Sequence, residues 1–203
     1  MRIRIGVIVA VGLAILLGAS CTKRVWIEPA VDTTAYKRLA ILPFTSENTS
    51  YASITSQLAD EITLLLLEKA PDVQVVERTK ISVLTLPENL QDGARSKEEV
   101  AIALGQLLEV DAVLTGTVIM SVENISSGTE WDRRVYNGVA IVRLVDTRDG
   151  RIVWAKREET EHSASRSLYG SAGWRTDSEV VREVVRDLAG LVTQNFYAHY
   201  ERR

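Results

Sequence analysis

The stretch YNGVAIVRLVDTRDGRIVWAKRE, residues 136–158, decides the expected fold. Its first part, 136–146, is rich in β-branched side chains, which favour strands. The turn TRDG (147–150) ends in Asp-Gly, a strong hairpin signal, and residues 151–158 pair back as a second strand. DAVLTGTVIMSV (111–122) predicts one more strand just before this hairpin.

Helical periodicity occurs on both sides of these strands. Apolar residues recur every three or four positions in 50–70, which predicts a long helix. Residues 96–108 predict another, which begins with the capping box Ser96 and Glu99. A last helix begins near Thr176, which forms a capping box with Glu179. We expect its buried face to contain Val180, Val184, Leu188, Leu191 and Phe196.

The order of elements predicts the fold class. Strands at 37–44 and 73–78 and a short helix at 79–86 complete the set. The chain then runs strand, helix, strand, helix, helix, three strands, helix. We therefore expect an α+β fold, an α/β sandwich in which helices cover a mixed sheet of about five strands.

The N-terminus predicts export from the cytoplasm. Residues 1–20 combine Arg2 and Arg4 with a long apolar run and small residues at its end, as a secretory signal peptide does. The alternative is a retained membrane anchor, although a spanning helix needs about 20 apolar residues. Residues 21–36 then form a short tether, and 37–203 form a single periplasmic α/β domain.

Cys21 is the only cysteine, and its surroundings resemble a bacterial lipobox. Gly18-Ala19-Ser20 precede it, although the usual box has a branched aliphatic residue where Gly18 stands. The resemblance implies covalent acyl chains, palmitate among them, on Cys21; the alternative is a free thiol. Two or more chains hold a protein firmly to a membrane. Thr22 follows the cysteine where an Asp tends to retain such proteins at the inner membrane, so we expect the periplasmic face of the outer membrane.

Composition and motifs argue against several functions. The net charge of −3 disfavours a nucleic-acid partner, which requires a basic face. There are two histidines, His162 and His199, and no zinc, nucleotide or hydrolase motif. Adjacent carboxylates such as Glu158-Glu159 are expected to be solvated charges. We therefore expect no enzyme, no catalytic or metal-binding residue, no cofactor other than the lipid on Cys21, and no small-molecule substrate.

Four stretches, taken in order, resemble a known superfamily. They are KRLAILPF (37–44), VVERTKISVLTLPENL (75–90), LGQLLEVDAVLTGTV (104–118) and VRLVDTRDGRIVWA (142–155). Together they resemble the curli secretion lipoprotein (CsgG-type), the penicillin-binding-protein activator lipoprotein (LpoB-type) and the TolB amino-terminal domain. The resemblance implies one of two activities. Curli-type subunits assemble into oligomeric outer-membrane secretion channels, and activator-type domains dock onto envelope proteins.

Two windows distinguish these alternatives. A membrane strand needs about 9–11 residues of alternating polarity. Residues 121–137 carry five charges without alternation, so no barrel hairpin is expected there. Residues 162–174 alternate over one strand's length; we favour a serine-rich loop, with an edge strand as the alternative. The sequence thus favours a docking or assembly module and leaves the channel subunit as the alternative.

Aromatic and basic side chains in these windows are the predicted contact residues. Trp131 with Arg133 and Arg134, and Trp174 with Arg175, lie among polar residues, and Trp and Arg are common interface hot spots. The alternative is that each ring covers the sheet edge. If they are contacts, Trp131→Ala and Trp174→Ala weaken association with a partner or with a second copy and leave the melting temperature nearly unchanged.

Overall fold

The computed structural model describes residues 24–46, 51–76, 97–126, 131–167 and 176–202. The predicted helix at 79–86, Cys21, Ser96, Trp174 and Arg175 lie outside the described residues. The chain divides into two compact units, Met1–Glu28 with Ala198–Arg203, and Pro29–Tyr197. Within the described residues, no helix is both long enough and apolar enough to cross a membrane.

Over its described residues, the larger unit contains a six-stranded mixed sheet and three α-helices, which confirms the predicted α+β class. The strands are β2 (Arg38–Ile41), β3 (Thr45–Ser46), β4 (Gln74–Val76), β5 (Ala112–Ser126), β6 (Trp131–Asp146) and β7 (Ile152–Ser167). The helices are α2 (Ala52–Lys69), α5 (Lys97–Leu108) and α6 (Asp177–Thr193), and a 3-10 turn, η2 (Gln194–Phe196), follows α6.

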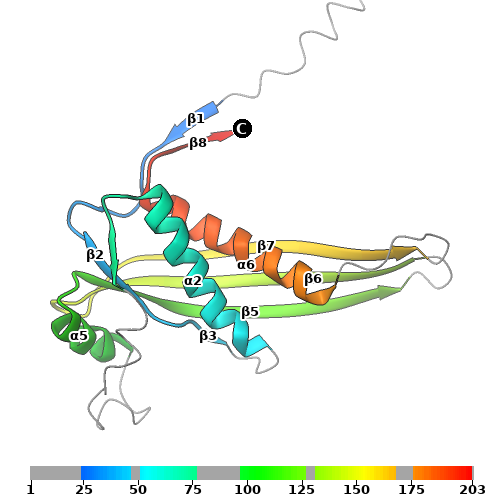
Figure 1. Ribbon diagram of the computed structural model, residues 1–203, viewed down its shortest axis with the longest axis horizontal. Coiled ribbons are helices and arrows are strands. Elements are labelled where there is room, and N and C mark those ends of the chain that lie inside the picture. Colours follow the sequence, from blue (N-terminus) through cyan, green and yellow to red (C-terminus); the bar gives the residue numbers. More distant parts are fainter. Residues whose placement is uncertain (1–23, 47–50, 77–96, 127–130, 168–175, 203) are drawn as a thin grey trace, which may run out of the picture. The chain divides into compact units, whose positions relative to one another are not determined.

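The sheet order is β4-β2-β5-β6-β7, and β3 pairs with β5 beyond the end of β2. The β2, β3 and β4 pairings are parallel, whereas β5, β6 and β7 form an antiparallel meander. The distal parts of β5, β6 and β7 extend past the short parallel strands (Figure 1). The larger unit therefore has a packed parallel end and a three-stranded projecting end.

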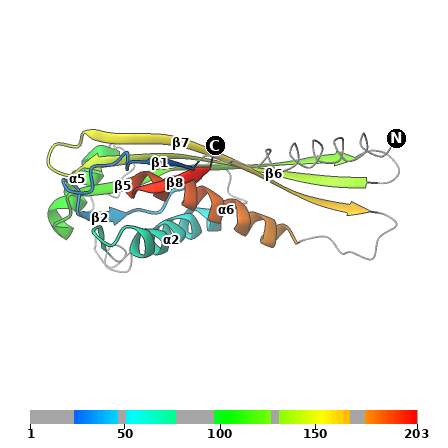
Figure 2. The same ribbon diagram turned by 90° about the horizontal axis from the view of Figure 1, so that it is seen from above.

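Helices cover the two faces unequally. Helices α2 and α6 lie on the same face of the sheet (Figure 2) and enclose the main core, which includes Leu58, Leu114 and Leu188. Helix α5 packs on the other face through Leu104 and Val113. The alternation of β5 side chains explains this division, because Val113 and Leu114 must point to opposite faces.

The last helix follows the sequence closely. Thr176 Oγ1 accepts a hydrogen bond from Glu179 N at 3.3 Å, and Thr176 N donates to Glu179 Oε2 at 2.8 Å, so the predicted capping box is confirmed. Of the predicted buried face, Val180, Val184, Leu188 and Phe196 are buried, and Leu191 is half-buried.

The three meander strands are longer than predicted. The strand expected at 111–122 runs to Ser126, and the one expected at 136–146 begins at Trp131. The prediction of a loop at 162–174 is wrong over its described part, 162–167. Strand β7 continues to Ser167 and pairs with β6 throughout, as in the alternative of an edge strand. The alternating side chains of that segment allow this pairing, since polar residues tolerate a partly exposed strand.

The smaller unit was not expected from the sequence. Strand β1 (Arg24–Ile27) lies within the stretch expected as a tether, and it pairs antiparallel with β8 (His199–Arg202), a strand absent from the predicted set. The two strands run side by side (Figure 1). Val31, also within that stretch, is buried in the larger unit, so ordered structure begins before residue 37.

Candidate functional site: a docking surface around helix α6

Two of the predicted contact arginines, Arg133 and Arg134, form ion pairs within the fold. Arg133 lies 3.7 Å from Glu161 of β7, and Arg134 Nη1 lies 2.9 Å from Asp177 Oδ1 at the start of α6. The Arg133 and Arg134 side chains are 50% and 44% exposed, so part of each still faces solvent. Trp131 is the first residue of β6, and its backbone pairs with Ser167 of β7. The structure thus joins Arg133 and Arg134 to neighbouring elements, and the contact role of all five residues stays a prediction.

Asp177 connects α6 to the projecting strands. Tyr136 Oη, from the buried Tyr136 side chain, donates to Asp177 Oδ1 at 2.6 Å beside the Arg134 contact. The hydrogen bond from Tyr136 lowers the pKa of the Asp177 carboxyl, with Arg134 adding to the effect. The negative charge at this helix N-terminus is also favoured by the helix dipole.

Asp146 forms a second junction where β6 ends, and this carboxylate is fully buried. Arg148 Nε and the Arg148 backbone N–H donate to Asp146 Oδ1 at 3.0 and 2.9 Å, and Tyr36 Oη donates to Oδ2 at 3.2 Å. The hydrogen bonds from Arg148 lower the pKa of Asp146 to about 2. Because every contact is within the fold, this carboxylate has a structural role in holding the β6–β7 turn.

His162 bridges β7 and α6. Its Nε2 lies 2.7 Å from Asp187 Oδ2, and its Nδ1 lies 3.4 Å from Glu183 Oε2. Over the described part of the chain, no group of three or more His, Cys, Asp or Glu side chains is arranged to hold a metal ion. Glu158 and Glu159 are adjacent in β7 and so point to opposite faces of the sheet. Glu158 pairs with Lys156, and Glu159 pairs with Arg157.

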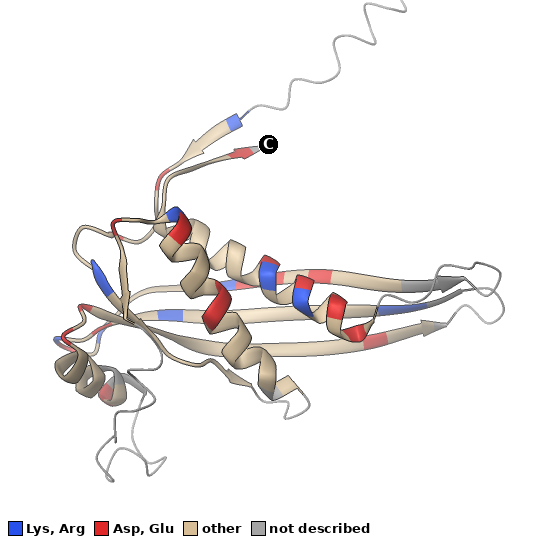
Figure 3. Cartoon of the chain, viewed as in Figure 1, with Lys and Arg blue, Asp and Glu red and all other residues tan. Residues whose placement is uncertain are grey.

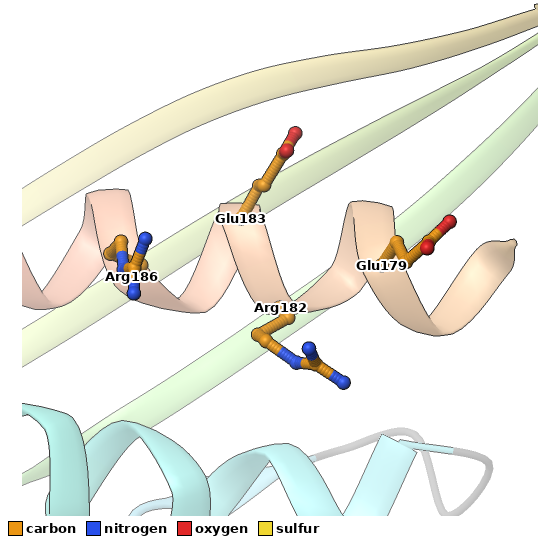
Figure 4. A pocket seen from close by; sticks show the side chains of 4 residues that line it. All are labelled: Glu179, Arg182, Glu183 and Arg186. Atoms are coloured by element: carbon orange, nitrogen blue, oxygen red, sulfur yellow. The ribbon is translucent and has the colours of Figure 1, made fainter. Parts of the chain in front are cut away.

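The exposed side of α6 carries charges of both signs along its length (Figure 3). Glu179, Arg182, Glu183 and Arg186 line a shallow hollow of about 380 Å³. They recur at spacings of three and four residues, so they lie on one helical face, and Arg182 is directed toward α2 (Figure 4). Such a mixed-charge ridge suits the polar rim of a protein interface.

A second hollow of about 440 Å³ lies over the C-terminal half of α6, and we call it the α6 saddle. Its lining consists of Leu65 of α2, Thr160 of β7, and Arg186, Asp187, Gly190, Leu191 and Gln194. The saddle forms at Gly190, where α6 has no side chain and a Cβ would meet nothing within 4 Å. Leu64 and Leu67 of α2 are 61% and 55% exposed, which adds apolar surface on that helix.

Gly190 is the residue of this surface that sequence reasoning missed. Glycine within a helix is about 1 kcal/mol less favourable than alanine. Gly138 of β6 differs, because a Cβ there would lie 2.3 Å from Val184 Cγ1 of α6. The available signal was a glycine inside the apolar periodicity of residues 180–191.

The chain belongs to the CsgG family, whose description is curli production assembly/transport component; the family profile matches residues 31–180. This membership associates the chain with the cell envelope. A search of curated protein sequences finds no match.

Among the solved structures that are similar to this chain, three illustrate the low sequence identity of the matches. Lipoprotein GNA1162 from Neisseria meningitidis is 17% identical, with 77% of this chain and 98% of that chain covered and a TM-score of 0.41. The LpoB C-terminal domain from Escherichia coli is 12% identical, with coverages of 72% and 90% and a TM-score of 0.41. The PelC dodecamer from Paraburkholderia phytofirmans is 14% identical, with coverages of 85% and 94% and a TM-score of 0.37. These likenesses carry no argument about activity.

Proposed function

We propose that this chain is a non-catalytic docking or assembly component of the bacterial envelope, held at the periplasmic face of the outer membrane by acyl chains on Cys21. Family membership supports the envelope assignment, and the lipobox-like Gly18-Ala19-Ser20-Cys21 supports the anchor. The partner is a protein, either another envelope protein or a second copy of this chain. It needs no cofactor and no small-molecule substrate.

The observation that carries the docking role is Gly190 in the α6 saddle. Internal packing does not require a glycine there, because a Cβ would meet nothing within 4 Å. A glycine that weakens a helix without an internal reason is accounted for by close approach of another backbone. The adjacent Leu65 and Leu191 supply apolar contacts, and Arg186 and Asp187 supply the polar edge that protein interfaces have.

The shape of the surface favours a protein partner over a small ligand. Leu64 and Leu67 of α2 are more than half exposed but lie about 100° and 160° around that helix from Leu65, so they are not part of the saddle. The two hollows on α6 are open and shallow, and charged side chains line most of the first. Small-molecule sites are concave and largely apolar, so this surface better suits a broad protein contact.

The channel-subunit alternative rests on the length of the projecting strands, since β5 has 15 residues and β6 and β7 have 16 each. A lipid-facing strand surface must be apolar over the membrane thickness. Here the Arg133–Glu161 pair lies on one face of the sheet, and Arg134 lies on the other. Charges on both faces favour the docking function over a membrane-inserted hairpin.

Site-specific photocrosslinking in intact cells tests the docking role. A photoreactive amino acid replaces Gln194 in the full-length chain, and adducts are detected by immunoblot. We expect a discrete adduct that is lost on adding Gly190→Leu, because the new side chain fills the saddle. The same photoreactive residue at exposed Arg151 is the matched control and gives no such adduct. Equal adducts at both positions, or an adduct insensitive to Gly190→Leu, contradict the proposal.

A further inference from the structure

Strands β1 and β8, from opposite ends of the chain, form an antiparallel pair that we call the β1–β8 hairpin, and its register places two arginine positions and two aromatic residues on one face. Arg24 is directly opposite Arg202, and Trp26 is directly opposite Tyr200. Alternate residues of a strand point to the same side, so both pairs belong to one face of the hairpin. The other face carries the pairs Val25 with Glu201 and Ile27 with His199.

The aromatic pair is largely open to solvent. Trp26 is 49% exposed and Tyr200 is 65% exposed, and their rings stack edge to face with centroids 4.8 Å apart. Trp26 Nε1 donates to Glu28 Oε1 at 2.7 Å. Trp and Tyr are enriched at membrane–water interfaces, where an apolar ring and a polar tip are both accommodated.

The two opposed arginine positions, 24 and 202, favour binding of a negatively charged group. Like charges directly opposite each other on paired strands are destabilising. An isolated two-stranded hairpin is also only marginally stable in water. An anionic group placed across Arg24 and Arg202 removes the repulsion and stabilises the hairpin at the same time. Arginine recognises phosphate well because its planar donors fit two oxygens.

The position in the chain identifies the source of that phosphate. Arg24 is three residues after Cys21. Three residues span at most about 11 Å, so an acyl chain on Cys21 keeps Arg24 at the membrane surface. Anionic lipids attract basic residues near the membrane within about a Debye length.

We infer that the β1–β8 hairpin is a phospholipid-binding surface, in which Trp26 and Tyr200 enter the membrane interface and Arg24 and Arg202 bind anionic headgroups. This inference rests on the proposed acylation of Cys21, which brings the hairpin to the bilayer. It assigns the hairpin a second membrane contact that fixes its orientation, in addition to the covalent anchor.

Fluorescence quenching in vesicles tests the aromatic part. The acylated full-length mature protein is reconstituted into phosphatidylethanolamine–phosphatidylglycerol vesicles, with and without lipids brominated on the acyl chains. The Trp26 contribution is the quenching of the unchanged protein minus that of Trp26→Phe. We expect Trp26→Phe to remove a distinct quenched component. Trp154→Phe, at a half-buried core position packed on Phe196, is the matched control and leaves that component in place.

The charge part is tested in the same vesicles by varying the phosphatidylglycerol fraction. Quenching of Trp26 should rise with that fraction, and the double variant Arg24→Gln with Arg202→Gln should lose the dependence. Arg151→Gln, whose side chain is 70% exposed in the other unit, should keep it.

Two further measurements distinguish failure of this inference from failure of the proposed acyl anchor on Cys21. Intact-protein mass spectrometry reports acylation of Cys21, and flotation reports vesicle attachment. If the protein is acylated and floats but Trp26 is not quenched, the hairpin inference is overturned and the anchor stands. If the acyl mass is absent, the proposed anchor fails, and the inference that rests on it falls too.

Discussion

At the scale of single residues, two carboxylates hold the larger unit together by accepting hydrogen bonds. Asp146 ties the β6–β7 turn to Tyr36, and Asp177 ties the start of α6 to Tyr136 and Arg134. Both carboxyls have a lowered pKa in the folded chain. A carboxyl whose pKa is lower when folded stabilises the fold above its unfolded pKa and loses that effect as the pH falls.

Asp146→Asn should reduce stability at neutral pH and flatten the acid dependence. The fully buried Asp146 has a folded pKa of about 2 against 3.8 for the free group, so its contribution is lost as the pH falls from about 4 toward 2. That contribution is on the order of 2 kcal/mol at pH 7. Urea unfolding followed by tryptophan fluorescence between pH 7 and pH 3 measures it.

The control for this experiment is Asp72→Asn, at an exposed position, which should change the free energy of unfolding by less than about 0.5 kcal/mol. An Asp146→Asn protein with the acid dependence of the unchanged chain would show that Asp146 does not carry this effect.

Tyr136→Phe should lower the free energy of unfolding by about 1–2 kcal/mol, because it removes a hydrogen bond to a charged group. The pKa of Asp177 should rise at the same time, since the Tyr136 hydroxyl is the largest cause of its depression. Carboxyl titration by NMR and urea unfolding measure the two effects. Tyr200→Phe, at a mostly exposed tyrosine, is the matched control. Equal stability losses in both variants would argue against the Tyr136–Asp177 bond.

At the scale of elements, two glycines of the α6 region have opposite roles. Gly138 lets α6 approach the sheet, since a Cβ there would lie 2.3 Å from Val184 Cγ1. Gly190 is on the open side of the same helix, where a Cβ would meet nothing within 4 Å. The first is required by internal packing, and the second is not.

Alanine at these two positions should therefore change stability in opposite directions. Gly138→Ala should destabilise the chain by about 1–3 kcal/mol through overpacking. Gly190→Ala should stabilise it by about 0.4–1 kcal/mol, because alanine favours the helix and restricts the unfolded chain. Thermal and urea unfolding of the two variants give the signs. Destabilisation by Gly190→Ala would mean that an internal contact, and not an external one, determines this glycine.

The sequence predicts some of these elements better than others, and the physical reason differs in each case. The capping box at Thr176 and the hairpin turn before Arg151 are local chemistry, so the sequence reveals both. The ends of β6 and β7 are set by cross-strand pairing between residues far apart in the sequence, such as Trp131 and Ser167, which no local pattern encodes. The β1–β8 pairing joins the two ends of the chain and escapes local reasoning for the same reason.

The proposed docking surface is only partly predictable from the sequence. Residue type predicts Trp131 and Arg133 as contacts, and the structure places Arg133 3.7 Å from Glu161 of the neighbouring strand. The α6 saddle depends on α2, α6 and β7 meeting around Gly190, a juxtaposition that requires the tertiary structure. The sequence does not predict the role of Asp146 either. Tyr36, which donates a hydrogen bond to it, is far away in the sequence, and Arg148 donates a second one.

At the scale of the whole molecule, the chain is an α+β protein of the CsgG family. The proposed protein-docking surface lies around α6 in the larger unit, and the proposed lipid contact is the β1–β8 hairpin of the smaller unit. The charges on both faces of the projecting strands argue that this chain does not contribute a membrane-inserted hairpin. The oligomeric state therefore distinguishes this account from a channel subunit.

The most direct test is the molar mass of the acylated protein extracted in mild detergent, measured by light scattering after size exclusion. We expect a monomer or a small oligomer, the state of a tethered docking domain. A large discrete ring, with the conductance of a channel as its consequence in bilayers, would contradict it.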